Sequence, residues 1–282
     1  LKSVGDHITV FGFDSAYYGI VIALGMVAGF FMASWQATRL GQDKDIYLDL
    51  ALWDIIFAII GARLYYVIFS WDYYGKHPME ILNTRGGGMA IYGGVIAGVL
   101  TTFIFAKVKK LSFFDLTDAA CGGLLVGQIF GRWGNFFNRE AFGGYTNNLF
   151  AMQLKRSQVR AGDMTKDVLK HLVNIDGIQY IQVHPTFLYE LLWNIGVLAV
   201  VLLWTKKRKY KGQLFLIYLC GYGLGRCWIE GLRTDQLKFF GTQIAISQIL
   251  SAVLFLGAAS ILLWKAVKAK REKNAQESIV KD

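Results

Sequence analysis

Long apolar blocks are the feature that most constrains the fold of this chain. Of its 282 residues, 54% are hydrophobic, and they gather in blocks that a soluble helix would interrupt with a polar face. The blocks run roughly over 15–35, 48–70, 88–107, 115–137, 184–204, 212–231 and 243–264. Each approaches the ~20 residues that a helix needs to cross a lipid bilayer. The sequence therefore predicts an all-α polytopic membrane protein with about seven transmembrane helices.

The lysines and arginines between the blocks predict which side of the membrane each end faces. Short connections that are rich in these residues stay in the cytoplasm. The connections after the first, third, fifth and seventh blocks form the more basic set, and the runs 206–211 and 265–273 are its most basic members. We therefore expect the N-terminus outside and the C-terminus in the cytoplasm.

The segment between the fourth and fifth blocks predicts a small extracytoplasmic α/β insertion. Its turn at 145–148, its charged stretch 153–170 and its alternating residues 178–183 are typical of a helix with a strand or two. The expected parts are helices one to four with a glycine-rich outer loop (1–137), the insertion (138–183), helices five to seven (184–264) and a basic cytoplasmic tail (265–282). From about Lys268 onward we expect the tail to be frayed.

Composition excludes several classes of function. The net charge of +10 lies in short clusters beside the apolar blocks, where anionic membrane lipids explain it better than nucleic acid does. No basic segment precedes the first block, so we expect a retained helix rather than a signal peptide. Cys121, Cys220 and Cys227 lie in predicted helices without C-x-x-C spacing, so neither a disulfide framework, a metal site nor a cofactor is expected.

Polar side chains near the outer ends of the apolar blocks predict a site. A charge in the hydrocarbon costs on the order of 2.5–3.5 kcal/mol on insertion scales, so such residues usually face a partner, a cavity or a substrate. Structural ion pairs are one explanation, for Arg226 with Glu230 four residues on, or for Arg63 with Asp118 or Glu190. Convergence favours a site, because one set of polar residues maps to the outer half of the membrane: Arg132, Glu140, His184, Glu190, Glu230 and Arg233. Several guanidinium groups at that level suit a phosphodiester, whose oxygens they bind two at a time.

Glycines at 86–98 lead from an outer loop into the third block and allow two interpretations. Close helix packing through small residues is the simpler one, and we favour it for Gly94 and Gly98. The other is that the backbone and the phenol of Tyr92 approach a lipid head group. Tyr18, near the outer edge of the first block, is either an interfacial aromatic or a site residue.

The quoted motifs resemble those of the bacterial prolipoprotein diacylglyceryl transferase family. The run Gly131-Arg132-Trp133-Gly134-Asn135-Phe136-Phe137-Asn138-Arg139-Glu140 matches that family's signature G-R-x-[GA]-N-F-x-N-x-E. Supporting matches, in the family's order, are Tyr18-Gly19, the Gly-Gly-Met-x-x-[HY]-Gly-Gly pattern at 87–94, His184-Pro185 with Tyr189-Glu190, and Gly225-Arg226-x-x-x-Glu230-x-x-Arg233 with Asp235.

The resemblance implies an enzyme of the bacterial plasma membrane whose active site faces the extracytoplasmic side. Such an enzyme moves the diacylglyceryl group of phosphatidylglycerol to the lipobox cysteine in the signal peptide of a prolipoprotein, and releases glycerol phosphate. It implies catalytic roles for Arg132, Arg226, Tyr92 and Glu140. It further implies lipid or substrate contacts for a second set: Tyr18, Gly93, Gly94, Asn135, Asn138, Gly143, Glu230 and Arg233. In this scheme Glu140 orients Arg132, and Glu230 orients Arg226.

Tyr92 stands where the family often has histidine, so the histidine sometimes proposed as general base is absent here. A phenol with an ordinary pKa near ~10 is a poor base at neutral pH. We interpret Tyr92 as a hydrogen-bonding group that positions the lipid, and Glu140 remains a candidate base. A transporter or binding protein for an anionic lipid is the alternative function, although the internal repeats typical of transporters do not appear in the sequence.

Overall fold

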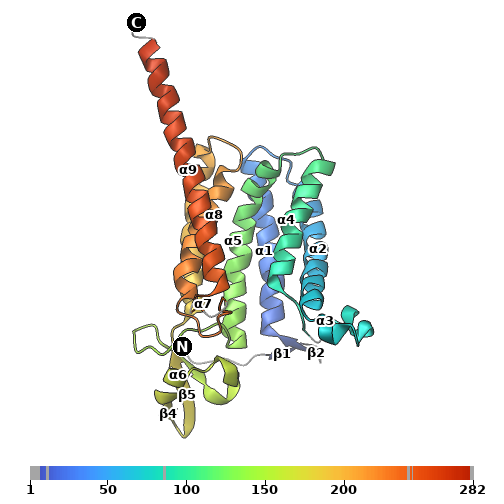
Figure 1. Ribbon diagram of the computed structural model, residues 1–282, viewed down its shortest axis with the longest axis vertical. Helices are drawn as coiled ribbons and strands as arrows, with labels where there is room; N and C mark the ends of the chain where they lie inside the picture. Colours follow the sequence, from blue (N-terminus) through green and yellow to red (C-terminus); the bar gives the residue numbers. More distant parts are fainter. Residues whose placement is uncertain (1–6, 11–12, 85–86, 240–241, 243, 280–282) are drawn as a thin grey trace. The chain divides into compact units, whose positions relative to one another are not determined.

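The computed structural model describes residues 7–10, 13–84, 87–239, 242 and 244–279. Seven long helices dominate it: α1 (Tyr17–Arg39), α2 (Ile46–Phe69), α4 (Ile91–Val108), α5 (Phe113–Asn138), α7 (Thr186–Trp204), α8 (Gln213–Glu230) and α9 (Ile246–Ile279). The predicted blocks therefore fall on helices, with ends that differ by a few residues except at the end of α9. Shorter elements are α3 (Trp71–Tyr74), α6 (Lys166–Lys170) and a hairpin of β1 (His7–Val10) and β2 (Phe13–Ala16) (Figure 1). The sequence did not predict the hairpin.

Six of these helices, rather than the expected seven, are long and apolar enough to cross a membrane by length and composition. They are α1, α2, α4, α5, α7 with its short extension, and α9. The exception is α8, whose Gln213, Arg226 and Glu230 interrupt the apolar residues within only 18 positions. The described residues thus form a mostly helical, multi-pass membrane protein.

The expected frayed tail is instead helical, because α9 continues to Ile279. Two pairs spaced four residues apart, Lys268 with Glu272 and Lys273 with Glu277, bring opposite charges together at 3.9 and 3.6 Å. Such pairs support an exposed helix. The expectation was wrong since charge alone does not unwind a segment whose charges alternate at helical spacing.

The chain divides into two compact units: a smaller one of residues 30–120, and a larger one of residues 1–29 and 121–282. In the smaller unit α2 packs closely on α4. A Cβ atom on Gly93 would lie 2.3 Å from the carbonyl oxygen of Gly61, so this contact requires glycine. Gly94 has more room, and a Cβ atom on Gly98 would meet no described atom within 4 Å. Close packing therefore depends on Gly93, rather than on Gly94 and Gly98 as expected from the sequence.

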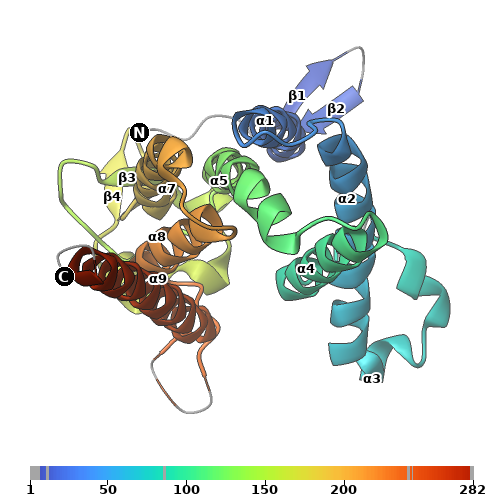
Figure 2. The ribbon, with the colours of Figure 1, turned by 90° about the horizontal axis from the view of Figure 1, so that it is seen from above.

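In the larger unit α7, α8 and α9 lie side by side (Figure 2). Gly223 lets α8 approach the backbone of α9, because a Cβ atom there would lie 2.8 Å from the carbonyl oxygen of Ser251. Gly225 accommodates the indole ring of Trp193 from α7, whose Nε1 would lie 2.1 Å from a Cβ atom at that position. Small residues on α8 thus set the helix spacing in this unit.

The insertion is a three-stranded antiparallel sheet in the order β3 (Met152–Lys155), β5 (Ile178–Val183), β4 (Val173–Ile175), with the short helix α6. Leu154 pairs with Ile181 in the register, and both are fully buried. Within the larger unit the insertion follows the end of α5 and leads into α7 (Figure 1). Its core includes Phe136 of α5 and Phe187 of α7, so the insertion is anchored directly on the helix ends that carry the signature residues.

Candidate functional site

Three helix ends of the larger unit gather the candidate site. The last turns of α5 present Arg132, the first turns of α7 present Glu190, and the last turns of α8 present Arg226 and Glu230. Glu190 and Glu230 are buried, at 3% and 4% exposure. Acidic groups at this depth need paired cations, because an isolated buried carboxylate would be neutralised. The sequence places these charged residues at the helix ends, and the packing of the helices brings the acidic groups next to the arginines.

Glu190 is the centre of the cluster. Its Oε2 atom lies 3.2 Å from Nη1 of Arg132 and 2.9 Å from Nη1 of Arg226. One carboxylate oxygen therefore holds two guanidinium groups from two different helices. The two Nη1 atoms are therefore no further apart than the sum of these two distances. Several N–H donors thus lie close enough together to bind one small anion.

A second carboxylate, Glu230, extends the cluster along α8. Its Oε2 atom lies 2.6 Å from Nη2 of Arg226 and 3.7 Å from Nη1 of Arg233. Ser247 of α9 donates to its other oxygen at 2.6 Å. The expected pairing of Glu230 with Arg226 is confirmed.

Arg233 and Asp235 form a two-bond pair beside Glu230. Nε and Nη2 of Arg233 donate to the two carboxylate oxygens at 2.9 and 2.7 Å. Burial by itself would raise the pKa of Asp235, but the hydrogen bonds from Arg233 hold that pKa below its usual value. Burial by itself would lower the pKa of Arg233. The hydrogen bonds and the negative charge of Asp235 outweigh burial, so the pKa of Arg233 is raised. This pair stays charged at neutral pH.

Glu140 has other partners than the expected Arg132. Its Oε1 atom accepts hydrogen bonds from Nδ2 of Asn135 at 3.1 Å and of Asn138 at 3.2 Å. Its Oε2 atom faces Nη2 of Arg160, from the insertion, at 3.9 Å. Arg132 instead binds Glu190. The two asparagines of the signature therefore hold Glu140, and the expectation failed since no pattern in the sequence specifies which of two acids a given arginine meets.

The chain turns sharply where the signature ends. Arg139 and Ala141 adopt left-handed backbone angles, with φ of 53° and 59°, on either side of Glu140. Such angles are uncommon for residues with a Cβ atom. Thr186 of α7 donates to the carbonyl oxygen of Ala141, and this contact helps to hold the turn.

Gly143 then ties three segments together. It forms a bridge with Arg233, and its N–H donates to the carbonyl oxygen of His184 at 3.0 Å. A Cβ atom at Gly143 would lie 2.7 Å from that of His184 and 2.8 Å from the carbonyl oxygen of Leu232. Glycine is therefore required for packing at this position, whether or not substrate also contacts it.

Tyr18 packs against the signature helix. A Cβ atom on Gly134 would lie 2.8 Å from the Tyr18 ring, so the two helices approach closely at this glycine. The ring of Tyr17 stacks on Phe137 with centroids 5.1 Å apart. Tyr18 as a residue remains 38% exposed, so its neighbours do not enclose it completely.

Tyr92, Gly93 and Gly94 begin α4 in the smaller unit, where Arg63 lies buried on α2. Arg63 meets neither of its two expected acids but donates to four backbone carbonyl oxygens, those of Glu80, Ile81, Gly87 and Gly88, at 2.6 to 3.0 Å. It therefore fixes the loop that precedes α4. Of the glycine run at 86–88, only the last two residues belong to the part of the chain that the structure describes.

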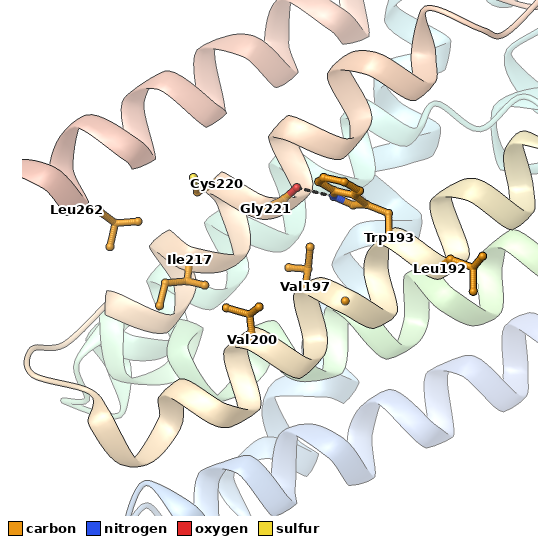
Figure 3. Close-up of a pocket in the computed structure, with 9 residues that line it drawn as sticks. Leu192, Trp193, Val197, Val200, Ile217, Cys220, Gly221 and Leu262 are labelled. Carbon is orange, nitrogen blue, oxygen red and sulfur yellow. Dashed lines mark hydrogen bonds between the residues drawn. The ribbon is translucent and has the colours of Figure 1, made fainter.

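A cavity of about 520 Å³ lies in the larger unit, and none of the arginines that the structure describes lines it (Figure 3). Its lining is apolar and comes from α7 and α8, with Leu262 from α9. Nε1 of Trp193, at one side of it, donates to the carbonyl oxygen of Gly221 at 2.8 Å. In a membrane helix bundle such a surface suits an acyl chain.

Cys220 also borders this cavity, and the three cysteines are free. Among the described residues no group of histidine, cysteine and acidic side chains could hold a metal ion.

Sequence reasoning singled out Glu190 as a polar residue but did not place it among the site residues. It also passed over Asn194 and Ser247. The sequence did contain a signal for Glu190. It is an acidic residue near the start of one apolar block, and two other apolar blocks carry arginine near their ends. Asn194 is fully buried one helical turn further along α7, and neither of its amide atoms has a hydrogen-bond partner among the described residues.

Comparison with known proteins assigns this chain to a family. Residues 7–264 match the family model described as prolipoprotein diacylglyceryl transferase. The chain belongs to the prolipoprotein diacylglyceryl transferase family. It is therefore a transferase of that class, and the family match decides between the enzyme and the transporter that the sequence left open.

Individual bacterial members of the family agree with this assignment. The phosphatidylglycerol–prolipoprotein diacylglyceryl transferase of Bacillus licheniformis is 44% identical over 261 residues, which cover 93% of this chain and 92% of the relative. That of Bacillus cytotoxicus is 42% identical over 248 residues, with 86% and 87% covered. That of Clostridioides difficile is 38% identical over 266 residues, with 94% and 96% covered.

Proposed function

We propose that this transferase uses phosphatidylglycerol as donor and the lipobox cysteine of a prolipoprotein signal peptide as acceptor. The proposal is supported by the names of the relatives and by the chemistry of the cluster. The thiolate sulfur attacks the glyceryl carbon, a thioether bond forms, and the C–O bond to phosphate breaks. Its electron pair leaves on the phosphate oxygen of glycerol phosphate, and the thiol proton goes to a base.

The arrangement of Arg132 and Arg226 around one carboxylate oxygen is the observation that carries this proposal. In the reaction a phosphodiester with one negative charge becomes a phosphate monoester with a larger charge. Preorganised guanidinium groups stabilise charge that develops on the leaving oxygen, and this lowers the barrier. Arg233, held by Asp235, is a third and more peripheral cation.

The remaining roles are those that the motifs shared with the family support. Asn135 and Asn138 hold Glu140, which in turn is a candidate to receive the thiol proton. Tyr18 offers its hydroxyl group to the glycerol region of the lipid, and Tyr92, Gly93 and Gly94 position the head group. Glu230 orients Arg226, and Gly143 shapes the loop beside His184. The apolar cavity of α7 and α8 takes one acyl chain of the donor.

We further propose seven crossings, with the N-terminus and the reacting groups on the extracytoplasmic side and the C-terminus in the cytoplasm. The seventh crossing is α8, because it lies alongside α7 and α9 (Figure 2). The basic connections support this orientation through the positive-inside rule. The membrane is the plasma membrane, where secreted precursors emerge.

One assay tests the proposed donor and acceptor together. Purified protein in micelles is given phosphatidylglycerol and a lipobox peptide, and the peptide is analysed by mass spectrometry. The expected result is a gain equal to one diacylglyceryl group, with release of glycerol phosphate. A peptide with serine in place of the lipobox cysteine is the matched control. Transfer from phosphatidylethanolamine at an equal rate would contradict the proposed donor, and an unmodified cysteine peptide would contradict the reaction.

A further inference from the structure

The charges of the arginine cluster balance among its own side chains. Three arginines, Arg132, Arg226 and Arg233, face three carboxylates, Glu190, Glu230 and Asp235. Two guanidinium groups this close would otherwise repel each other by a few kcal/mol, even at an effective dielectric constant of about 20. An incoming phosphodiester adds a negative charge to a balanced cluster. If one carboxylate gives up its contacts, the N–H donors that it occupied become available to the phosphodiester.

Glu190 is the carboxylate best placed to do so. It holds both arginines through Oε2 alone, while its Oε1 atom is buried and has no hydrogen-bond partner within the described part of the chain. Glu230 is held by Ser247 as well, and Asp235 is held through two bonds. Glu190 therefore holds its partners through a single oxygen atom, whereas Glu230 and Asp235 use both of theirs.

Asn194 supplies an alternative partner for Glu190. The two residues are four apart on α7, so their side chains lie on the same face about one turn apart. Asn194 is fully buried, and its Nδ2 donor and Oδ1 acceptor both lack a partner among the residues described. A buried unpaired amide group destabilises a protein, and the donor of Asn194 and the free oxygen of Glu190 are chemically complementary. The bond between them is not made in this structure.

We propose that Glu190 stands in for the lipid phosphate and that Asn194 receives it when the lipid binds. In the lipid-free enzyme Glu190 keeps Arg132 and Arg226 together. When the phosphodiester takes the two guanidinium groups, the Glu190 side chain turns toward the Asn194 amide. Asn194 is thus a positioning residue whose unpaired state favours lipid binding. This inference rests on the proposed function, since it takes the arginines as the phosphate-binding groups.

The variant Asn194→Leu tests the exchange through two opposite effects. Removal of the unpaired amide should raise the thermal midpoint of the lipid-free enzyme by a few degrees. Loss of the alternative partner should raise KM for phosphatidylglycerol roughly tenfold, with a smaller change in kcat. A purely structural asparagine would instead lower the thermal midpoint. An unchanged KM, or a lower thermal midpoint, would overturn the inference.

A double variant and a matched control complete the test. Glu190→Gln removes the charge that competes with the lipid, so in its presence Asn194→Leu should have less than about a third of its effect on KM. Additive effects would contradict an exchange between the two residues. Gln128→Leu removes another partly buried amide of the larger unit, one that donates to Tyr218 at 2.9 Å, and should leave KM within about twofold. If instead Arg132→Lys turns over normally, the proposed function itself is wrong.

A second inference comes from a different part of the larger unit, the loop at 147–150. Leu149 and Phe150 are 94% and 57% exposed at its tip. Nδ2 of Asn148 donates to the hydroxyl oxygen of Tyr189 at 3.3 Å, and Tyr189 lies in the first turn of the candidate span α7. The ring of Tyr189 stacks on Trp228 at 6.4 Å between centroids, as aromatic residues do at a membrane surface. The loop tip therefore lies at the level where α7 enters the bilayer.

We infer that Leu149 and Phe150 insert into the outer leaflet and anchor the insertion beside the site. In a variant whose three cysteines are serine, a spin label on Leu149→Cys should be more accessible to oxygen than to a water-soluble nickel complex in phosphatidylglycerol-containing vesicles. The control is Ile178→Cys in the β4–β5 hairpin, a 42% exposed apolar residue, which should favour the nickel complex. A photoreactive residue at 149, with the native cysteines kept, should crosslink to acyl chains and one at 178 should not. Water-like accessibility at 149, or equal crosslinking at both positions, would overturn the inference.

Discussion

The two units of the molecule use buried arginine in opposite ways. In the smaller unit Arg63, only 7% exposed, donates to four backbone carbonyl oxygens and so fixes a loop. In the larger unit Arg132 and Arg226 bind a carboxylate side chain. Carbonyl groups are part of the chain and cannot be exchanged, whereas a carboxylate can give way to another anion. An arginine at the end of a membrane helix is therefore a site residue only if its partner can be replaced.

The largest expected effect is that of Arg132→Lys, set against Arg63→Lys. Lysine keeps the charge of Arg132 but loses the planar fork, so a transition-state contact of ~2–4 kcal/mol should be lost, which is roughly 30- to 1,000-fold in rate. Arg63→Lys should lower the thermal midpoint and leave kcat of the folded enzyme nearly unchanged. Steady-state transfer to a lipobox peptide measures both. Equal losses of kcat in the two variants would erase the distinction between the units.

Next in size is Gly93→Ala, in the smaller unit. The added Cβ atom would lie 2.3 Å from the carbonyl oxygen of Gly61, so α2 and α4 have to separate, at a cost of about 1–3 kcal/mol in the free energy of unfolding. Gly98→Ala is the matched control, because its Cβ atom would meet none of the described atoms within 4 Å. Thermal unfolding in detergent compares them. Full stability of Gly93→Ala with weakened lipid binding would assign Gly93 to the head group and not to packing.

Tyr92 tests whether the smaller unit takes part in the chemistry. As a positioning group it should lose about 1–2 kcal/mol in Tyr92→Phe, about 5- to 30-fold in rate, and Tyr92→His should be tolerated. As a general base it should lose roughly the 10²–10⁴-fold typical of proton transfer, and histidine should shift the pH optimum downward. Rates over about pH 6 to 10 separate the cases. A fall beyond roughly a thousandfold with lipid binding intact would contradict the positioning role.

The smallest effect concerns His184, which contacts the Tyr189 hydroxyl group at 3.2 Å in the larger unit. Burial lowers the pKa of His184 below its ordinary value of 6.5. The unfolded chain then binds more protons than the folded one, so stability is full above pH 6.5 and falls as the pH decreases from 6.5 toward the folded pKa. His184→Gln should flatten the dependence of the thermal midpoint on pH in that window. An unchanged slope would show that other groups cause it.

The pairing of Arg226 with Glu230, four residues apart on one helix, could be predicted, but the pairings between helices could not. The positions of Arg132, Arg226 and Glu230 at helix ends followed from apolar blocks that end in charged residues. Their mutual distances depend on how α5, α7 and α8 pack, which no local pattern encodes. For this reason Glu140 was expected to bind Arg132, and Glu190 had no assigned role.

The fold, too, was predicted in part. The length of the apolar blocks predicted the long helices, because backbone groups in a bilayer have to be satisfied within each helix. The count of six candidate spans and the helical tail differed from expectation, since composition near the ends of helices is ambiguous between helix, loop and membrane surface. The β1–β2 hairpin was missed because its strands have only four residues each.

By itself the sequence determined a multi-pass helical membrane protein of the prolipoprotein diacylglyceryl transferase family, because hydrophobic length and a long, specific motif are properties of the chain read in order. Only the tertiary structure decided which side chains are partners. In it Glu190 contacts two arginines, and Glu140 accepts hydrogen bonds from two asparagines. Arg63 donates to backbone carbonyl groups, and Asn194 is buried without a partner in the described part of the chain. The physical reason is that ion pairs and packing require contact between residues far apart in sequence, and contact is set by how the helices pack.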